Sequence, residues 1–135
     1  MITFKYRKET SAITGTILRP VADVIFESGR RKAEAALYID SGADITTIPL
    51  ELGKVLGFKQ SSKDEIREIQ GVSGGGVPYL LKSAHIRLNG KRLKIRLAWA
   101  LIEEVPLLLG RLDIFDKFKI LFNEKLASIT FTPVS

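Results

Sequence analysis

The 135-residue chain has no cysteine, one histidine and one tryptophan. Without cysteine it has neither a disulfide framework nor a thiol nucleophile, and this absence fits a cytoplasmic location. A metal site needs several ligands, and His85 is the only histidine. With this single histidine on a predicted strand, the sequence also gives no convincing Ser-His-Asp relay. We therefore expect no metal and no other cofactor.

Long apolar runs are also lacking. No run approaches the roughly 20 apolar residues that a membrane-spanning helix needs, and residues 1–6 alternate like a strand rather than forming the apolar core of a signal peptide. We expect no membrane association. Hydrophobic residues make up 45% and charged residues 27%, which is ordinary for a globular protein. This length suits one domain, spanning residues 1–135.

The net charge is +6, and a basic surface can attract nucleic acid. The lysines and arginines are nevertheless dispersed, and in residues 91–96 they alternate with apolar residues, as on the solvent face of a strand. Aromatic residues make up only 8%, and no base-stacking motif is evident. A β-barrel that binds nucleic acid is therefore the hypothesis that we favour least, and we expect no nucleic-acid partner.

Strand signals dominate the chain. Residues 20–40 read as a hairpin, and residues 85–99 form a second one around Asn89-Gly90, a dipeptide that suits the positive φ of a tight turn. Short helices are predicted over 49–56, with Pro49 as the first helical residue, and over 111–118. Many short strands with one or two short helices predict an all-β fold, either a barrel or a sandwich.

The only glycine-rich stretch is Gly71-Val72-Ser73-Gly74-Gly75-Gly76. It lacks the lysine and the spacing of a phosphate-binding loop. It separates two candidate strands, 66–69 and 79–81, so we interpret it as the mobile tip of a hairpin, because glycine gives the backbone freedom. A plain flexible surface loop is the alternative.

The segment Asp40-Ser41-Gly42-Ala43-Asp44 follows an apolar run, 35–39, that predicts a buried strand. A carboxylate at such a strand end is costly unless it is paired or used in chemistry. Asp followed by Ser or Thr and then Gly occurs by chance in roughly one chain in twenty of this length, so the tripeptide alone is weak. The motif occurs once, and a second carboxylate would have to come from a second, identical chain.

Two such carboxylates can hydrolyse a peptide bond. At about 3 Å they cannot both ionise, so the pair shares one proton. The ionised member takes a proton from the attacking water, and the protonated member stabilises the oxyanion. In this interpretation Asp40 supplies the carboxyl, Ser41 supplies a hydroxyl that bonds across the dimer, and Gly42 permits close approach of the backbone. Asp44 either accepts hydrogen bonds from substrate amides or pairs with a nearby arginine.

Three segments together resemble the retropepsin-like aspartic proteases, the small dimeric class that includes the retroviral proteases. Residues 39–44 are similar to the active-site loop of that family. Residues 106–111, Pro-Leu-Leu-Leu-Gly-Arg, resemble its apolar segment ending in Gly-Arg. The glycine-rich stretch lies between them, where the family carries its flap. The order and spacing agree over residues 20–131, although position 41 is Ser rather than the commoner Thr.

The resemblance implies a closed, barrel-like acid-protease fold of six or seven strands, and a homodimeric endopeptidase acting on peptides or proteins. Asp40 would be catalytic. Ser41, Gly42 and Arg111 would support the active-site loop, with Arg111 forming an ion pair with Asp44. Substrate backbone would contact a set of loop and flap residues, namely Gly42, Asp44, Ser73, Gly74, Gly75 and Gly76. The alternative is a catalytically silent module of the same fold that binds peptides or dimerises.

The two ends of the chain leave a choice open. Residues 2–4 and 129–131 are short strand-like segments. They either interleave between two chains at the dimer interface, as in that family, or pair within one chain. Residues 1–19 otherwise carry no motif.

Overall fold

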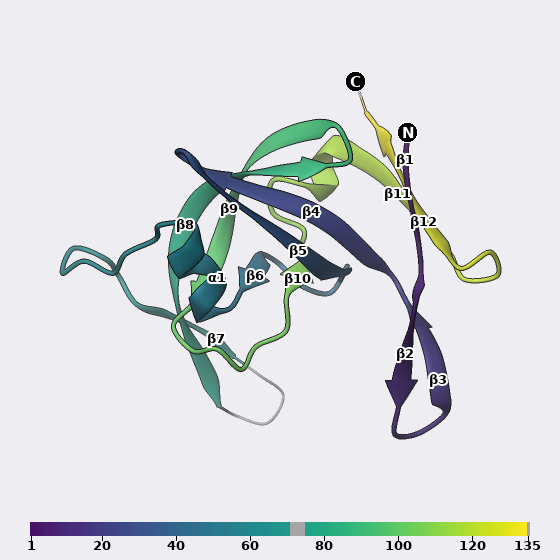
Figure 1. The fold of residues 1–135 in the computed structure, drawn as a ribbon, viewed down its shortest axis with the longest axis horizontal. Helices are drawn as coiled ribbons and strands as arrows, with labels where there is room; N and C mark the ends of the chain where they lie inside the picture. Colours follow the sequence, from purple (N-terminus) through teal and green to yellow (C-terminus); the bar gives the residue numbers. More distant parts are fainter. Residues whose placement is uncertain (71–74, 135) are drawn as a thin grey trace.

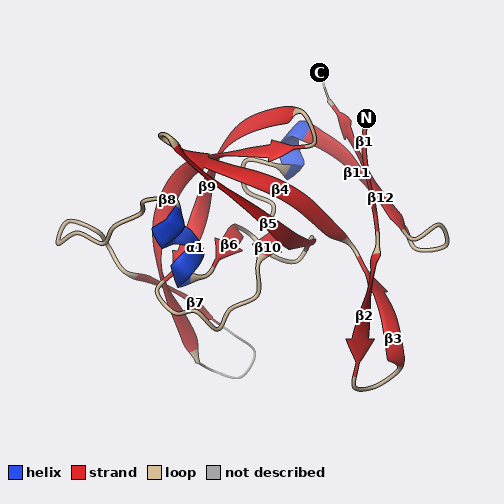
Figure 2. Cartoon of the chain, in the orientation of Figure 1, coloured by secondary structure: helices blue, strands red, loops and turns tan. Residues whose placement is uncertain are grey.

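The computed structural model of the chain describes residues 1–70 and 75–134. Strands account for most of it, with one short α-helix and one 3₁₀ turn (Figure 2). The elements are β1 (Ile2–Lys5), β2 (Arg7–Ser11), β3 (Gly15–Arg19), β4 (Val21–Ser28), β5 (Arg31–Ile39), β6 (Thr46–Ile48), α1 (Leu50–Val55), β7 (Arg67–Gln70), β8 (Gly76–Leu88), β9 (Lys91–Ala100), β10 (Leu108–Leu109), η1 (Phe115–Lys117), β11 (Phe118–Asn123) and β12 (Ser128–Pro133).

Six strands form a closed barrel in the order β4-β5-β10-β6-β9-β8, and β8 completes the ring by pairing with β4 (Figure 1). β7 extends the sheet beyond β8. The predicted all-β, closed barrel-like fold is thus confirmed. Among the described residues, no helix has the length and apolarity needed to cross a membrane.

Alternation of apolar and polar residues explains why these strands form a barrel. In β9, Leu93, Ile95 and Leu97 are almost fully buried, while the intervening positions are exposed. The turn from β8 to β9 has φ of 52° at Asn89 and 114° at Gly90, the positive values expected from the sequence. The predicted hairpin over 20–40 is also present as β4 and β5.

The two helix predictions fare differently. The first is confirmed as α1, but Pro49 is the N-cap rather than the first helical residue, and Gly57 follows the helix with φ of +84°. The second, over 111–118, is wrong in extent because only η1, a single 3₁₀ turn, forms there. Asp113 has φ of 65°, which breaks any helical path through this segment.

The chain ends pair with each other within one molecule. β1 runs antiparallel to β12, and β11 lies on the other side of β12. Three aromatic rings hold this sheet together, because Phe131 makes edge contacts with Phe4 and Phe118 at centroid distances of 5.8 and 5.4 Å. The pairing of residues 2–4 with 129–131 within one chain is therefore the arrangement present here.

Residues 7–19 form a two-stranded ribbon of β2 and β3, which we call the β2–β3 arm. Apart from pairing with each other, these strands join no sheet in the described part of the chain. The arm projects from the barrel next to the start of β4 (Figure 1). Sequence reasoning did not identify it.

Candidate active site

Asp40 is the first residue after β5, at the end of a barrel strand. Its backbone position is fixed from two sides. The Ile39 N–H donates to the carbonyl of Pro20 at 3.0 Å, and the Asp40 N–H donates to the carbonyl of Leu109 at 3.1 Å. Asp40 is half-buried, so its carboxylate stands at the rim of the barrel rather than inside it.

The turn after Asp40 orients its carboxylate. The N–H of Gly42 donates to Asp40 Oδ1 at 2.9 Å, and the N–H of Ala43 donates to the Asp40 carbonyl at 3.2 Å. A Cβ at position 42 would lie 3.3 Å from the same Oδ1, closer than most such contacts. Glycine therefore allows this N–H to reach the carboxylate without crowding it.

Residues 110–113, which follow β10, hold the Asp40 loop in place, and we call this segment the bracket. The N–H groups of Arg111 and Leu112 donate to the carbonyls of Ala43 and Asp44, both at 2.9 Å. These bonds join the two motifs singled out in the sequence, which are some seventy residues apart. Because they use backbone groups only, the loop is held by the course of the chain itself.

Gly110 completes the bracket. Its N–H donates to the buried hydroxyl of Thr46 at 3.1 Å. A Cβ at Gly110 would lie only 2.3 Å from the backbone carbon of Ile45, so no side chain fits here. Sequence reasoning missed Thr46, which lies six residues after Asp40 and is buried in β6. Its hydroxyl supports the loop directly, because it accepts the Gly110 N–H.

The predicted ion pair between Arg111 and Asp44 is not formed among the described residues. The Arg111 guanidinium instead donates from Nη1 to the carbonyl of Ser41 at 3.4 Å. Both charged side chains line the same hollow of about 510 Å³, together with Arg96 and Asp113. Arg111 thus contacts the active-site loop through Ser41 rather than through the Asp44 carboxylate.

Asp113 anchors the bracket to the barrel wall. Its carboxylate accepts three hydrogen bonds of 2.9 Å from Arg96, one from the backbone N–H and two from the guanidinium. The Arg96 guanidinium is the main cause that lowers the pKa of Asp113 to about 2. Since Arg96 is on β9 and Asp113 is two residues after Arg111, this pair ties the segment that holds the Asp40 loop to the sheet.

A hollow of about 400 Å³ opens beside Asp40, with Arg19 and Tyr38 on its wall. The Arg19 guanidinium carbon lies 5.6 Å from the centre of the Tyr38 ring. The Tyr38 hydroxyl donates to Glu9 Oε1 at 2.8 Å, and this hydrogen bond, with burial, raises the pKa of Tyr38. Sequence reasoning assigned no role to these residues, because the contacts join strands that are far apart along the chain.

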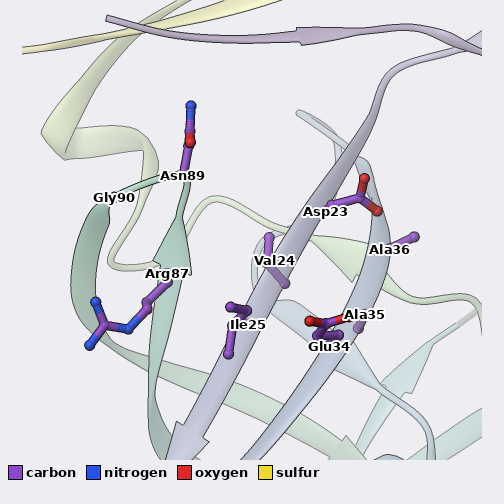
Figure 3. Close-up of a pocket in the computed structure, with 9 residues that line it drawn as sticks. All are labelled: Asp23, Val24, Ile25, Glu34, Ala35, Ala36, Arg87, Asn89 and Gly90. Atoms are coloured by element: carbon purple, nitrogen blue, oxygen red, sulfur yellow. The ribbon is translucent and has the colours of Figure 1, made fainter.

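A larger hollow, about 750 Å³, lies elsewhere on the barrel, and Asp40 does not line it (Figure 3). Its walls come from β4, β5, the end of β8 and the β8–β9 turn. Two of its charged groups already have partners, since Asp23 pairs with Arg7 and Arg87 pairs with the buried Glu27 at 3.0 Å. Size alone therefore does not mark the candidate active site.

The predicted site residues fall into three groups. Asp40, Ser41, Gly42, Asp44 and Arg111 come together at the loop and its bracket. The structure places Gly75 and Gly76 at the end of the β7–β8 hairpin, where Gly76 pairs with Gln70. Ser73 and Gly74 lie outside the described residues. Within 1–70 and 75–134, no three His, Asp or Glu side chains gather closely enough to hold a metal ion.

Comparisons with known proteins support the fold. No protein-family model and no curated protein sequence matches the chain. Among solved structures, it is similar to an EIAV protease complexed with the inhibitor HBY-793, with a TM-score of 0.54 and 22% sequence identity. The match covers 76% of this chain and 88% of that protease. The chain therefore has a retropepsin-like fold.

Proposed function

We propose that this protein is a homodimeric aspartic endopeptidase in which each chain contributes one Asp40 carboxyl. The observation that carries the proposal is the position of Asp40 on a loop held rigidly at the barrel rim, with Oδ1 fixed by the Gly42 N–H at 2.9 Å. A carboxylate placed in advance in this way can act without further rearrangement of its loop. The solved retropepsin-like neighbour supports the same reading at the level of the fold.

The chemistry follows from bringing two such loops together across a twofold axis. Two carboxyls at about 3 Å would share one proton, because like charges that close cannot both persist. The ionised oxygen takes a proton from a water molecule as the water attacks the peptide carbonyl. The protonated carboxyl donates a hydrogen bond to the carbonyl oxygen as negative charge develops there. Collapse of the tetrahedral intermediate then breaks the C–N bond, and the carboxyl that took the proton from water gives it to the departing amine nitrogen, so the pair again holds one proton.

The substrate would be an extended peptide. An extended chain can be held by main-chain hydrogen bonds, as an added strand would be. Gly42 and Asp44 are exposed on the Asp40 loop, where they can meet such a backbone. The opposing contacts would come from the flap candidates Gly75 and Gly76, with Ser73 and Gly74 retained as predictions.

The test is cleavage of a peptide library between pH 4 and 7, with and without an inhibitor that mimics the tetrahedral intermediate. The variant Asp40→Asn keeps the shape of the side chain and removes its acid, so we expect cleavage to disappear while the circular dichroism spectrum is unchanged. Glu104→Gln makes the same chemical change at an exposed position after β9 and should cleave like the wild type. Cleavage retained in Asp40→Asn would refute the proposal. A wild-type dimer that binds peptides without cleaving them would favour the silent binding module.

A further inference from the structure

The β2–β3 arm exposes two apolar side chains, one at its tip and one near its base. Ile13, at its tip, is 94% exposed, and Leu18 in β3 is 47% exposed. A two-stranded ribbon is marginally stable by itself in water, and β2 and β3 pair only with each other in the described part of the chain. These two side chains thus lack the apolar burial that stabilises the other strands.

The base of the arm, in contrast, is firmly held. Arg7 forms an ion pair with Asp23 on β4. Glu9 accepts a hydrogen bond from the Tyr38 hydroxyl at 2.8 Å and pairs with Arg19 at 3.2 Å. Arg7 and Glu9 join β2 to β4 and β5, and the Arg19 guanidinium over the Tyr38 ring joins β3 to β5. These contacts fix the direction in which the arm leaves the barrel.

That base lies directly beside the catalytic candidate. Pro20 follows the last residue of β3, and its carbonyl accepts the N–H of Ile39, the residue before Asp40. Arg19 and Pro20 line the same hollow as Asp40. If two Asp40 side chains meet on a twofold axis, the base of each arm must therefore lie next to that axis. Strands of five residues span roughly 17 Å, which is enough to extend well over the second chain.

We propose that the β2–β3 arm packs on a second copy of this chain and buries Ile13 and Leu18 there. The inference rests on the proposed function, because the Asp40 pair is what places the axis. By symmetry a dimer has two arms, so each apolar contact is made twice. The arms supply apolar area for association, whereas the loops at the axis contribute mainly polar and charged groups.

The first test compares dimer dissociation constants by sedimentation equilibrium. Ile13→Thr combined with Leu18→Thr keeps strand-compatible side chains and removes the exposed apolar groups. We expect the dissociation constant to rise by about tenfold or more, since each dimer loses both contacts twice. Val55→Thr is the matched control, because Val55 is 52% exposed on α1, away from the arm. A dimer as tight in the double variant as in the wild type would overturn the inference.

The second test locates the tip directly. Because the chain has no cysteine, Ile13→Cys gives a single site for an environment-sensitive fluorophore. We expect its emission to shift to shorter wavelength as protein concentration rises through the dimerisation range, with no shift for Val55→Cys. A label at position 13 that stays in water throughout that range would contradict the inference.

The two proposals fail in different ways. A wild-type protein that dimerises and cleaves peptides, with arm variants that dimerise equally well, would refute the arm and leave the protease intact. A wild-type protein that stays monomeric at every concentration would remove the Asp40 pair, and both proposals would fall with it.

Discussion

Asp113→Asn should weaken the folded state measurably at neutral pH. Asn tolerates the positive φ of 65° at this position and keeps the volume, so the change isolates the charge that meets Arg96. The pKa of Asp113 falls from 3.8 to about 2 on folding. This lowering of the pKa corresponds to about 2.4 kcal/mol, and because Arg96 is 52% exposed, solvent screening lowers our expectation to about 1–2 kcal/mol.

The direction of the pKa change determines the pH range over which this stabilisation is lost. A lowered pKa in the folded state means that the unfolded chain binds the proton more tightly, so this stability is complete above pH 3.8 and is lost as pH falls towards 2. In urea denaturation, the free energy of unfolding of the wild type should exceed that of Asp113→Asn at pH 7. This difference should shrink as the pH falls from 3.8 towards 2. Asp116→Asn is the control, since the Asp116 side chain is 76% exposed. Equal stability of wild type and Asp113→Asn at pH 7 would refute the reasoning.

Two glycine substitutions test the support of the Asp40 loop, and a third, Gly75→Ala, is the control. Gly110→Ala places a Cβ 2.3 Å from the backbone of Ile45, so we expect a loss of about 3 kcal/mol or more in urea denaturation. Gly75→Ala meets nothing within 4 Å and should change stability by less than about 0.5 kcal/mol. Gly42→Ala places a Cβ 3.3 Å from Asp40 Oδ1 and should lower kcat at least about tenfold, with a near-normal melting temperature. A stable Gly110→Ala or a fully active Gly42→Ala would contradict the loop geometry.

Local sequence signals predicted the hairpins well, because their information lies within a few residues. Asn89-Gly90 supplies both positive φ values, and the alternation in 91–99 sets which side chains face the barrel interior. Closure of the barrel depends instead on the pairing of β4 with β8, strands separated by some fifty residues. It was expected here from the family resemblance rather than from any local pattern.

Contacts between distant charged residues could not be predicted. Residues 111–118 are predicted as a helix because their propensities allow one. In the structure the Asp113 carboxylate accepts a hydrogen bond from the Arg96 N–H on β9, and the positive φ of Asp113 interrupts the helical path. The same limit explains the predicted Arg111–Asp44 pair. Its two residues do line one hollow, but the arginine bonds to the Ser41 carbonyl instead.

The β2–β3 arm was missed for a related reason. Residues 7–19 are rich in Thr, Ser and charged residues, and no apolar alternation identifies a buried face. In the described part of the chain, the polar contacts of the arm with the barrel lie at its base, where Glu9 meets Tyr38 and Arg7 meets Asp23. A ribbon without a buried face leaves little pattern in a sequence.

The support of the Asp40 loop is complete within one chain. Its bonds run to Leu109, Arg111 and Leu112 of the same molecule, and the Gly42 N–H already orients the carboxylate. Dimerisation would therefore add the second carboxyl without having to fold the first, and association would require little ordering of the site. Weakening the dimer should then reduce activity at low protein concentration and restore it at high concentration. Damage to the bracket, as in Gly110→Ala, should reduce activity at every concentration, because it disturbs the loop inside each chain.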